Sequence, residues 1–443
     1  MGRIYEKIKQ FPFTPGNKPF FYGWIILIAG IIGMLISVPG QTIGVSVFTD
    51  PLLEALRVSR VNLSNAYMFG TFLSALLITR AGYFYDRFGA RITAVSAGFC
   101  LGLVLFFFSR IDRIVFGMHD LFNFTEHVIL AGVLATLGFF GLRFFGQGVL
   151  TMLSRNMVMK WFDARRGFVN MFLGAFVAVG FSLAPQFFNS LIENFTWRGA
   201  WFYISIFAGI FFPVFAFIFF RDNPHMYGLI PDGSLVKPKK LLISRKSNSV
   251  RDYELSEVKR EFLFWIFNLA LVMNALYITA ITFHIESIFE TAGMTKQQAI
   301  SIFFPTAIIA LIFSIAGNFS SDYIKLKYLL YIDITGLLFS SVALVLLRDS
   351  FFITGLLIFG NGMANGMFGV ISAITWPRFF GLKSLGAISG YSTSWWVAGS
   401  AVGPFLFSLS FRFIGNYKMA AMFCAIVSLV LLFLAVRSKK IEK

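Results

Sequence analysis

Twelve long apolar stretches constrain this chain more than any other feature of its sequence. A helix that crosses a lipid bilayer needs about 20 mostly apolar residues, and most of these stretches contain no formal charge. They occupy residues 21–48, 61–82, 92–109, 128–158, 168–192, 199–220, 262–285, 299–320, 328–347, 351–376, 385–410 and 417–436. The pattern predicts an all-α integral membrane protein with twelve transmembrane helices.

Composition supports this prediction. Hydrophobic residues make up 57% of the 443 residues and charged residues 13%, whereas soluble domains have about 45–50% and about 25%. Such a chain has too few polar residues to cover its apolar surface, so lipid must surround it. Cys100 and Cys424 both lie inside apolar stretches, which favours packing residues over a disulfide or a metal site. We expect no cofactor and no metal.

The distribution of Lys and Arg predicts the orientation in the membrane. With both termini on one side, that side holds 26 of the 38 basic residues, and the opposite side holds nine. Loops on the cytoplasmic side carry such an excess. We therefore predict cytoplasmic termini and a multi-pass protein of the inner (plasma) membrane. The same bias explains the net charge of +17 without a nucleic-acid partner; the bilayer is the expected surrounding, and we expect a functional monomer.

The longest polar interruption, 221–261, divides the chain into two six-helix halves. The predicted organisation is an N-terminal tail, an N-terminal bundle, a cytoplasmic central loop, a C-terminal bundle and a C-terminal tail. Their bounds are 1–20, 21–220, 221–261, 262–436 and 437–443. A second interruption at 110–127 is predicted to lie along the outer membrane interface as a short amphipathic segment.

The two halves repeat a short motif after their second spans. In the first half, an acid and a base lie five residues apart at Asp86 and Arg91; in the second half, Asp322 and Lys327 have the same spacing. The first motif is completed by Gly82, Arg87 and Gly89. Corresponding motifs in two halves are typical of transporters built from repeats, with the substrate site between the halves near the middle of the bilayer.

The first motif resembles the G-x-x-x-D-R-x-G-x-R loop of the major facilitator superfamily, and Arg143, Gly146 and Gln147 resemble the family's R-x-x-Q-G motif in span four. The resemblance implies that the motif loop acts as a conformational latch in which the acid meets a neighbouring helix end and the arginines. It also implies that spans one, four, seven and ten line a central cavity.

A narrower resemblance is to the bacterial monocarboxylate and oxalate/formate transporter branch, and it implies an organic anion as the substrate. It rests on Tyr22-Gly23-Trp24, Lys160-Trp161-Phe162, Arg166-Gly167, Asn223-Pro224, Tyr227-Gly228-Leu229 and Phe264-Trp265. That branch often holds the carboxylate with a basic residue in span eight or eleven, whereas 299–320 and 385–410 contain no Lys or Arg here.

Span four carries the main candidate for a binding residue. At 100° per residue, Arg143, Gln147, Thr151 and Ser154 share one helix face. A charge at mid-membrane costs about 2.5–3.5 kcal/mol on insertion scales and normally faces an interior or aqueous cavity. Arg143 is interpreted either as an anion-binding residue or as a structural residue that donates to neighbouring helix carbonyls.

Other spans contribute polar candidates. Gln41 follows a proline in span one and either contacts substrate or repairs the kink. Asn361 and Asn365 share a face of span ten and either bind substrate or join helices through hydrogen bonds. Tyr277 in span seven completes the predicted substrate-binding set of Arg143, Gln147, Gln41, Tyr277, Asn361 and Asn365.

Two residues are candidates for carrying a coupling proton. His284 near the outer end of span seven titrates close to neutral pH, although a lone histidine at a helix end is more often only a hydrogen-bonding residue. Asp333 in span nine is protonatable, and a structural partner is the alternative.

The sequence contains no P-loop, paired-histidine metal motif or nucleophile elbow, so an enzyme is not expected. We predict a secondary active transporter of a small polar solute, an organic anion held by Arg143, coupled to a proton or a counter-substrate and working by alternating access. Proton-coupled efflux of amphipathic compounds is the alternative, and a membrane sensor or accessory protein that does not transport is a third class.

Overall fold

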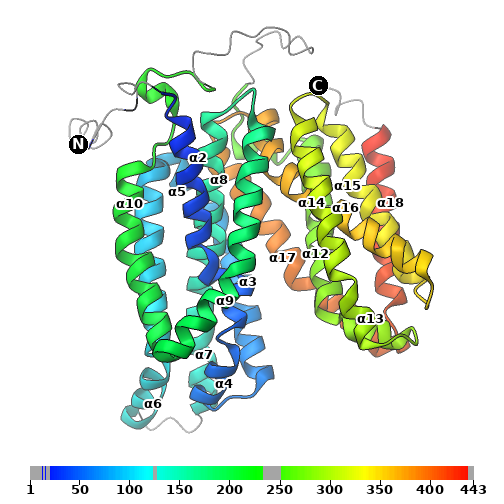
Figure 1. Ribbon diagram of the computed structural model, residues 1–443, viewed down its shortest axis with the longest axis horizontal. Helices are drawn as coiled ribbons and strands as arrows, with labels where there is room; N and C mark the ends of the chain where they lie inside the picture. Colours follow the sequence, from blue (N-terminus) through cyan, green and yellow to red (C-terminus); the bar gives the residue numbers. More distant parts are fainter. Residues whose placement is uncertain (1–11, 13–14, 16–19, 123–126, 233–250, 438–443) are drawn as a thin grey trace. The chain divides into compact units, whose positions relative to one another are not determined.

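The structure is a computed structural model that describes residues 12, 15, 20–122, 127–232 and 251–437 (Figure 1). Over these residues the chain is helical, with turns between the helices and no β-strand. Most of the predicted N-terminal tail, the middle of the central loop and almost all of the C-terminal tail lie outside the described residues. The all-helical fold class is confirmed for the part that the structure describes.

Among the described residues, the first half contains two π-helices, two 3-10 helices and a series of α-helices. They are α2 (Gly23–Ile36), η2 (Val38–Gly40), α3 (Thr42–Ser46), α4 (Thr49–Leu56), α5 (Arg60–Ser109), α6 (Ile111–Phe122), α7 (His127–Gly141), η3 (Leu142–Leu150), α8 (Thr151–Trp161), α9 (Arg166–Ile206), η4 (Phe207–Phe211), α10 (Phe212–Phe219) and η5 (Pro224–Tyr227).

The second half begins with one short helix and then has six longer helices and a connecting one. They are α11 (Leu255–Val258), α12 (Phe262–Thr291), α13 (Lys296–Ser301), α14 (Phe303–Ser321), α15 (Leu326–Val345), α16 (Phe351–Phe380), α17 (Leu385–Ile414) and α18 (Lys418–Arg437). In Figure 1, α15 lies beside α16 and α18, in agreement with its extensive packing against each of them.

Ten helical segments among the described residues are long and apolar enough to cross a membrane. Two of them, Asn62–Ser109 and Arg166–Phe219, have 48 and 54 residues, more than twice the length that one crossing needs. Each contains one residue with non-helical backbone angles, Gly89 (φ 79°) and Thr196 (φ 63°). The chain therefore has the multi-pass helical architecture that its apolar stretches predict.

The chain forms two compact units. The first comprises Met1–Ala164, Phe172–Lys239 and Leu385–Tyr391, and the second comprises Arg165–Met171, Lys240–Ser384 and Ser392–Lys443. Two helices thus change unit near their beginnings. The start of α9 belongs to the second unit although most of α9 lies in the first, and the start of α17 belongs to the first unit although most of α17 lies in the second.

Each unit has a packed interior and an apolar exterior. In the first unit the rings of Phe48 and Trp201 stack with centroids 3.9 Å apart, and a Cβ on Gly102 would lie 2.3 Å from the Cα of Gly209. Large apolar side chains on the outside, such as Phe351 and Phe304, are 97% and 76% exposed. Exposed rings on this scale suit a lipid environment.

Two local predictions can be compared with the structure. The kink expected at Pro39 is present as the short 3-10 helix η2, after which the backbone becomes extended at Gln41 and the helix restarts as α3. The interruption at 110–127 contains the amphipathic helix α6, where Asp112 accepts hydrogen bonds from Nε and Nη2 of Arg198. Residues 123–126 of the interruption lie outside the described residues.

Candidate functional site

Asp86 binds the first turn of α17. Its carboxylate oxygens accept hydrogen bonds from the backbone N–H groups of Gly386 (2.8 Å) and Ala387 (2.7 Å), all within the first unit. The first N–H groups of a helix have no partner inside the helix, and the helix dipole favours a negative charge there. The carboxylate of the motif therefore caps the N-terminus of a helix 300 residues away in the sequence.

Two glycines allow this close approach. A Cβ on Gly82 would lie 2.1 Å from the carbonyl oxygen of Gly386, and a Cβ on Gly386 would lie 2.5 Å from the carbonyl oxygen of Gly82. Real Cβ atoms do not occupy such positions without movement of the backbone. Gly82 of the motif is thus needed because a side chain there would separate the two helices. Its partner Gly386 was not identified from the sequence.

Asp322 makes the equivalent contact in the second unit. Its two carboxylate oxygens accept hydrogen bonds from the N–H groups of Gly167 (2.9 Å) and Phe168 (3.1 Å), in the first turn of α9. A Cβ on Gly167 would lie 1.9 Å from the carbonyl oxygen of Asn318, and the Asn170 amide donates to the Asn318 side chain at 2.7 Å. The sequence repeat therefore corresponds to a repeated contact.

The basic residues of the motif point to other partners. Nε of Arg91 donates to the carbonyl oxygen of Phe220 at 3.3 Å, and the exposed guanidinium of Arg87 lies over the ring of Phe88. In the second half, Nζ of Lys327 lies over the ring of Tyr328. The resemblance implies that the acid of the motif contacts both a helix end and the arginines. Asp86 contacts the start of α17, whereas Arg91 contacts a backbone carbonyl and Arg87 an aromatic ring.

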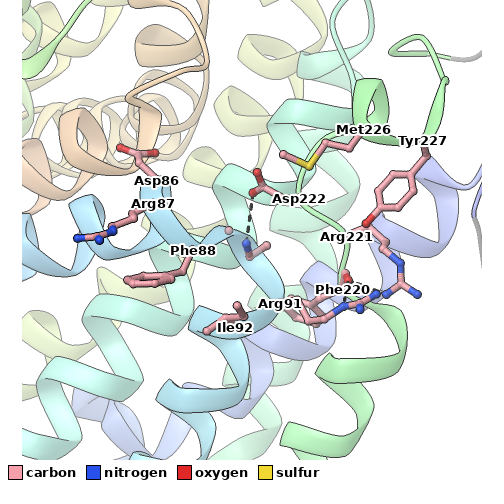
Figure 2. Close-up of a pocket in the computed structure, with 12 residues that line it drawn as sticks. Asp86, Arg87, Phe88, Arg91, Ile92, Phe220, Arg221, Asp222, Met226 and Tyr227 are labelled. Atoms are coloured by element: carbon pink, nitrogen blue, oxygen red, sulfur yellow. Dashed lines mark hydrogen bonds between the residues drawn. The ribbon is translucent and has the colours of Figure 1, made fainter. Parts of the chain in front are cut away.

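Asp222 connects the motif turn to the end of α8 (Figure 2). Its carboxylate accepts a hydrogen bond from the N–H of Ala90 (3.3 Å) and pairs with Nζ of Lys160 at 3.0 Å. The residues around it enclose a cavity of about 80 Å³ between the motif turn and the segment that follows α10. Sequence analysis did not identify Asp222, because nothing local marks an acid in a charged loop.

Burial affects the charge state of Asp86, which lies between the predicted spans 61–82 and 92–109. It raises the pKa of this carboxyl to about 6, although the N–H groups of Ala387 and Gly386 lower it. A raised carboxyl pKa means that the group is ionised above about pH 6 and becomes protonated as the pH falls through that value. The buried carboxyl therefore takes up a proton at a higher pH than an exposed carboxyl does.

Arg143 lies in a second polar cluster of the first unit. Nη1 donates to the carbonyl oxygen of Gly40 (3.3 Å) and to the hydroxyl of Thr42 (3.4 Å). The guanidinium lies 5.2 Å from the ring centroid of Tyr67, whose hydroxyl bonds Thr42 at 2.9 Å. Arg143 is 4% exposed, and its Nε has no hydrogen-bond partner among the described residues.

The helix around Arg143 is a π-helix, η3. Such segments occur frequently at functional sites, and their wider turn changes the face on which later residues lie. The face predicted with α-helical spacing is therefore altered: the Thr151 hydroxyl donates to the carbonyl of Gln147, and Ser154 packs against Gly33. Gln147 is half-buried.

Gln41 occupies the extended residue between η2 and α3. Its Nε2 donates to the hydroxyl of Ser37 at 3.1 Å across the Pro39 kink, and the side chain is half-buried. This bond matches the interpretation that Gln41 repairs the kink. The sequence analysis did not single out Tyr67 and had no candidate role for Thr42, which together bring two hydroxyl groups beside Arg143.

In the second unit, Asn274 and Asp333 lie together in the interior. Nδ2 of Asn274 donates to Oδ1 of Asp333 (2.8 Å) and to the carbonyl oxygen of Ala364 (2.9 Å). Asp333 is fully buried, and its Oδ2 has no partner among the described residues. Tyr277, one helical turn further along α12, is also fully buried and bonds the hydroxyl of Ser340 at 2.9 Å.

The remaining candidates are Asn361, Asn365 and His284. Asn361 is 8% exposed and its Oδ1 has no partner among the described residues, whereas Asn365 is exposed on α16. Nε2 of His284 lies 3.0 Å from the carbonyl oxygen of Pro404 and 3.3 Å from the hydroxyl of Ser408. Within the described part of the chain, no three His, Cys, Asp or Glu side chains are grouped to hold a metal ion.

Comparison with known proteins identifies the family of the chain. The family model described as Major Facilitator Superfamily matches residues 30–404. No curated protein sequence matches the chain. The solved proton:xylose symporter XylE, bound to 6-bromo-6-deoxy-D-glucose, is similar in structure, with a TM-score of 0.63 and 15% identity over 93% of this chain and 94% of that one.

Two other solved structures are similar at comparable levels. The human organic anion transporter MFSD10 has a TM-score of 0.59 and 14% identity, covering 95% of this chain and 100% of that one. The Escherichia coli fucose:proton symporter FucP has a TM-score of 0.58 and 15% identity, covering 94% and 97%. At such identities the similarity concerns the fold alone.

Proposed function

Since the chain belongs to the major facilitator superfamily, we propose that this multi-pass membrane protein is a secondary transporter that carries a small organic anion by alternating access. The observation behind the choice of an anion is the buried Arg143. Among the described residues no carboxylate pairs with it, and one guanidinium N–H has no acceptor. A buried cation is costly unless it is paired, so a substrate carboxylate would offset that cost.

The groups beside Arg143 suit the rest of a small polar anion. The hydroxyls of Thr42 and Tyr67 lie in the same cluster, and Gln41 and Gln147 are half-buried amides of the same unit. In the second unit, Asn361 and Asn365 are the candidates that we propose as further hydrogen-bonding ligands, and Tyr277 requires release from Ser340 to join them. MFSD10 is an organic anion transporter, which supports an anion as cargo on this fold.

We further propose twelve spans with cytoplasmic termini. A division of the two longest helices at Gly89 and Thr196 would turn ten segments into twelve, and the excess of Lys and Arg in the alternate loops supports the orientation. On this topology the domain bounds remain those predicted from the sequence, with bundles at 21–220 and 262–436.

The contacts of Asp86 and Asp322 are proposed as the conformational latch of the transport cycle. Each carboxylate binds the first turn of a helix whose later part belongs to the other unit. The later part of each helix can move with the other unit only if the start of the helix bends or these bonds yield. Gly82 permits the contact of Asp86, Gly89 provides the turn of positive φ after it, and Arg91 binds the carbonyl oxygen of Phe220. Arg87 and Lys327 are proposed as further members of the latch.

The test combines a binding screen with transport. A thermal-shift screen of the purified protein against small carboxylates, sugars, amino acids and nucleosides identifies ligands, and uptake into proteoliposomes measures their transport. Arg143→Gln should lower anion uptake about 10-fold to 100-fold, because a charge-assisted bond contributes about 1.5–3 kcal/mol. Arg80→Gln, which removes an exposed arginine of α5, is the control. Unchanged anion uptake in Arg143→Gln would contradict the proposal, and no flux of any solute would favour a sensor or accessory protein.

The coupling ion is proposed to be a proton. Asp333 and His284 are the candidate carriers, and XylE and FucP are proton symporters. In the same liposomes, uptake should follow an imposed pH gradient, and Asp333→Asn or His284→Gln should abolish that dependence. Uptake that depends only on a counter-substrate inside the liposomes would exclude both residues as carriers.

A groove in the first unit favours the second candidate function, efflux of amphipathic compounds. The cavity has a volume of about 380 Å³ between α5 and α7 and is lined mainly by apolar side chains, with two amides at one end. Its residues include Asn62, Asn65, Phe69, Ile129, Val133 and Leu137. Efflux of hydrophobic cations that is lost in Phe69→Asp but retained in Arg143→Gln would favour this function over anion transport.

A further inference from the structure

Asp232 holds the turn that precedes α9. Its Oδ2 accepts hydrogen bonds from the N–H groups of Asp163 (2.9 Å) and Ala164 (2.7 Å), and its own N–H donates to the carbonyl oxygen of Trp161 at 3.1 Å. These residues all belong to the first unit. Asp232 has a φ of 64°, a left-handed conformation in which Asp and Asn are among the commoner non-glycine residues.

Asp252 holds the corresponding turn before α17. Its Oδ1 accepts hydrogen bonds from the N–H groups of Leu382 (3.0 Å) and Lys383 (3.2 Å). The N–H of the next residue, Tyr253, donates to the carbonyl oxygen of Phe380 at 3.1 Å. Gly381 has a φ of 82°, and a Cβ there would lie 2.3 Å from the Asp252 carboxylate. Glycine at this position lets the carboxylate reach the turn.

The two turns are equivalent residue by residue. Asp163 and Ala164 differ from Leu382 and Lys383 by 219 in residue number, and the same difference separates Gly167 and Phe168 from Gly386 and Ala387. In each turn the earlier pair of N–H groups binds an acid of the central loop. The later pair binds the acid that follows the second or eighth span.

Each turn is also the point at which the chain changes unit. Residues up to Ala164 belong to the first unit and those from Arg165 to the second; residues up to Ser384 belong to the second unit and those from Leu385 to the first. The acid of the central loop therefore holds the turn to the unit that the chain is leaving. The other acid holds the helix start in the unit that the chain is entering.

We propose that Asp232 and Asp252 are positioning residues for the starts of α9 and α17. By fixing the first pair of N–H groups of each turn, they orient the next pair toward Asp322 and Asp86. Each central-loop carboxylate serves its own helix: Asp232 serves α9 and Asp252 serves α17. This role goes beyond the proposed transport activity, and its test needs no substrate.

Substitution by asparagine isolates the contribution of charge. Asn has the shape of Asp, tolerates the left-handed conformation at position 232, and keeps one acceptor oxygen while losing the charge that strengthens the bonds. The reporters are two buried serines whose side chains hydrogen-bond to residues other than these acids. Ser321 is fully buried where Gly167 meets α14, and Ser389 accepts a hydrogen bond from Nδ2 of Asn156 at 2.6 Å.

The experiment measures thiol labelling of the full-length protein in lipid vesicles. In a Cys100→Ser/Cys424→Ser background, Ser321→Cys reports on the start of α9 and Ser389→Cys reports on the start of α17. Asp232→Asn should raise the labelling rate of Ser321→Cys roughly tenfold and that of Ser389→Cys much less. Asp252→Asn should have the opposite preference. Asp349→Asn, which removes an exposed carboxylate at the opposite end of α15 from Asp322, is the control.

Double variants add a test of the pairing. Asp232→Asn combined with Asp322→Asn should be non-additive at the Ser321→Cys reporter, whereas Asp232→Asn combined with Asp86→Asn should be additive there, because only residues that share a structure are coupled. Where Asp232→Asn does not fold, Asp232→Ser, which keeps one short acceptor, takes its place. Labelling no faster than in Asp349→Asn overturns the proposal, and equal increases at both reporters overturn the pairing of one acid with one helix.

Discussion

The starts of α17 and α9 reach the same carboxylate contact through different backbone contacts. At α17, two glycines face each other, Gly82 and Gly386, so no side chain separates the helices. At α9, Gly167 faces Asn318, whose side chain bonds Asn170 at 2.7 Å. The charge on the acid is common to both sites, whereas the packing beneath it differs. The electrostatic part of the contact is thus repeated, and the steric part is specific to each half.

The largest effect is expected from a methyl group at the glycine pair. In Gly82→Ala the new Cβ would meet the carbonyl oxygen of Gly386 at 2.1 Å, and overpacking of this kind costs about 1–3 kcal/mol. The labelling rate of Ser389→Cys should therefore rise roughly 5-fold to 150-fold.

Gly174→Ala in α9 is the matched control for that substitution, because a Cβ there meets nothing within 4 Å. A Gly82→Ala protein that labels no faster than the Gly174→Ala protein would show that the two helices do not need their close approach. The glycine pair would then not distinguish α17 from α9.

A smaller effect is expected from Asn318→Gly, which gives the α9 contact a glycine pair like that of α17. The substitution removes the acceptor of the Asn170 amide, and loss of a neutral hydrogen bond costs about 1 kcal/mol. Labelling of Ser321→Cys should rise roughly 5-fold, and Asn170→Ala in the same protein should add nothing further. An added effect of Asn170→Ala would mean that Asn170 stabilises α9 through another partner.

The smallest effect is expected from pH. Because burial raises the pKa of Asp86 to about 6, a fall from pH 7.5 to 5.5 protonates most of this carboxyl and removes the charge from the start of α17. Because the buried carboxyl has a higher pKa than an exposed one, a bound proton favours the closed contact. The ratio of Ser389→Cys to Ser321→Cys labelling, in which the pH dependence of the thiol reaction cancels, should therefore fall about 2-fold to 4-fold. Asp86→Asn should give a ratio that does not change with pH.

Local sequence patterns predicted the parts of the molecule that depend on neighbouring residues. The apolar stretches located the helices, and the spacing of Asp86 and Asp322 indicated equivalent positions in the two halves. Gly386 and Gly167 were not predicted as contact residues, because each meets a helix that is far away in the sequence. Asp222 was missed for the same reason: its partners Ala90 and Lys160 lie in α5 and α8, far away in the sequence.

The candidate binding cluster shows the same division. A motif and a mid-span position indicated Arg143, and the alternative of donation to a helix carbonyl matches its bond to Gly40. The partners Thr42 and Tyr67 could not be placed without the fold, since they come from two other helices. The π-helix changed the predicted face as well, because helical periodicity assumes regular α-helical turns throughout a span.

The sequence by itself determined that lipid surrounds this protein and that its two halves repeat a motif. Twelve apolar stretches require lipid because exposed apolar surface in water is unfavourable, and two spaced acid–base motifs indicate related halves. Only the tertiary structure decided which N–H groups the acids bind, because a carboxylate selects its partners by distance. The four acids Asp86, Asp322, Asp232 and Asp252 act on two short turns, and no local pattern brings them there.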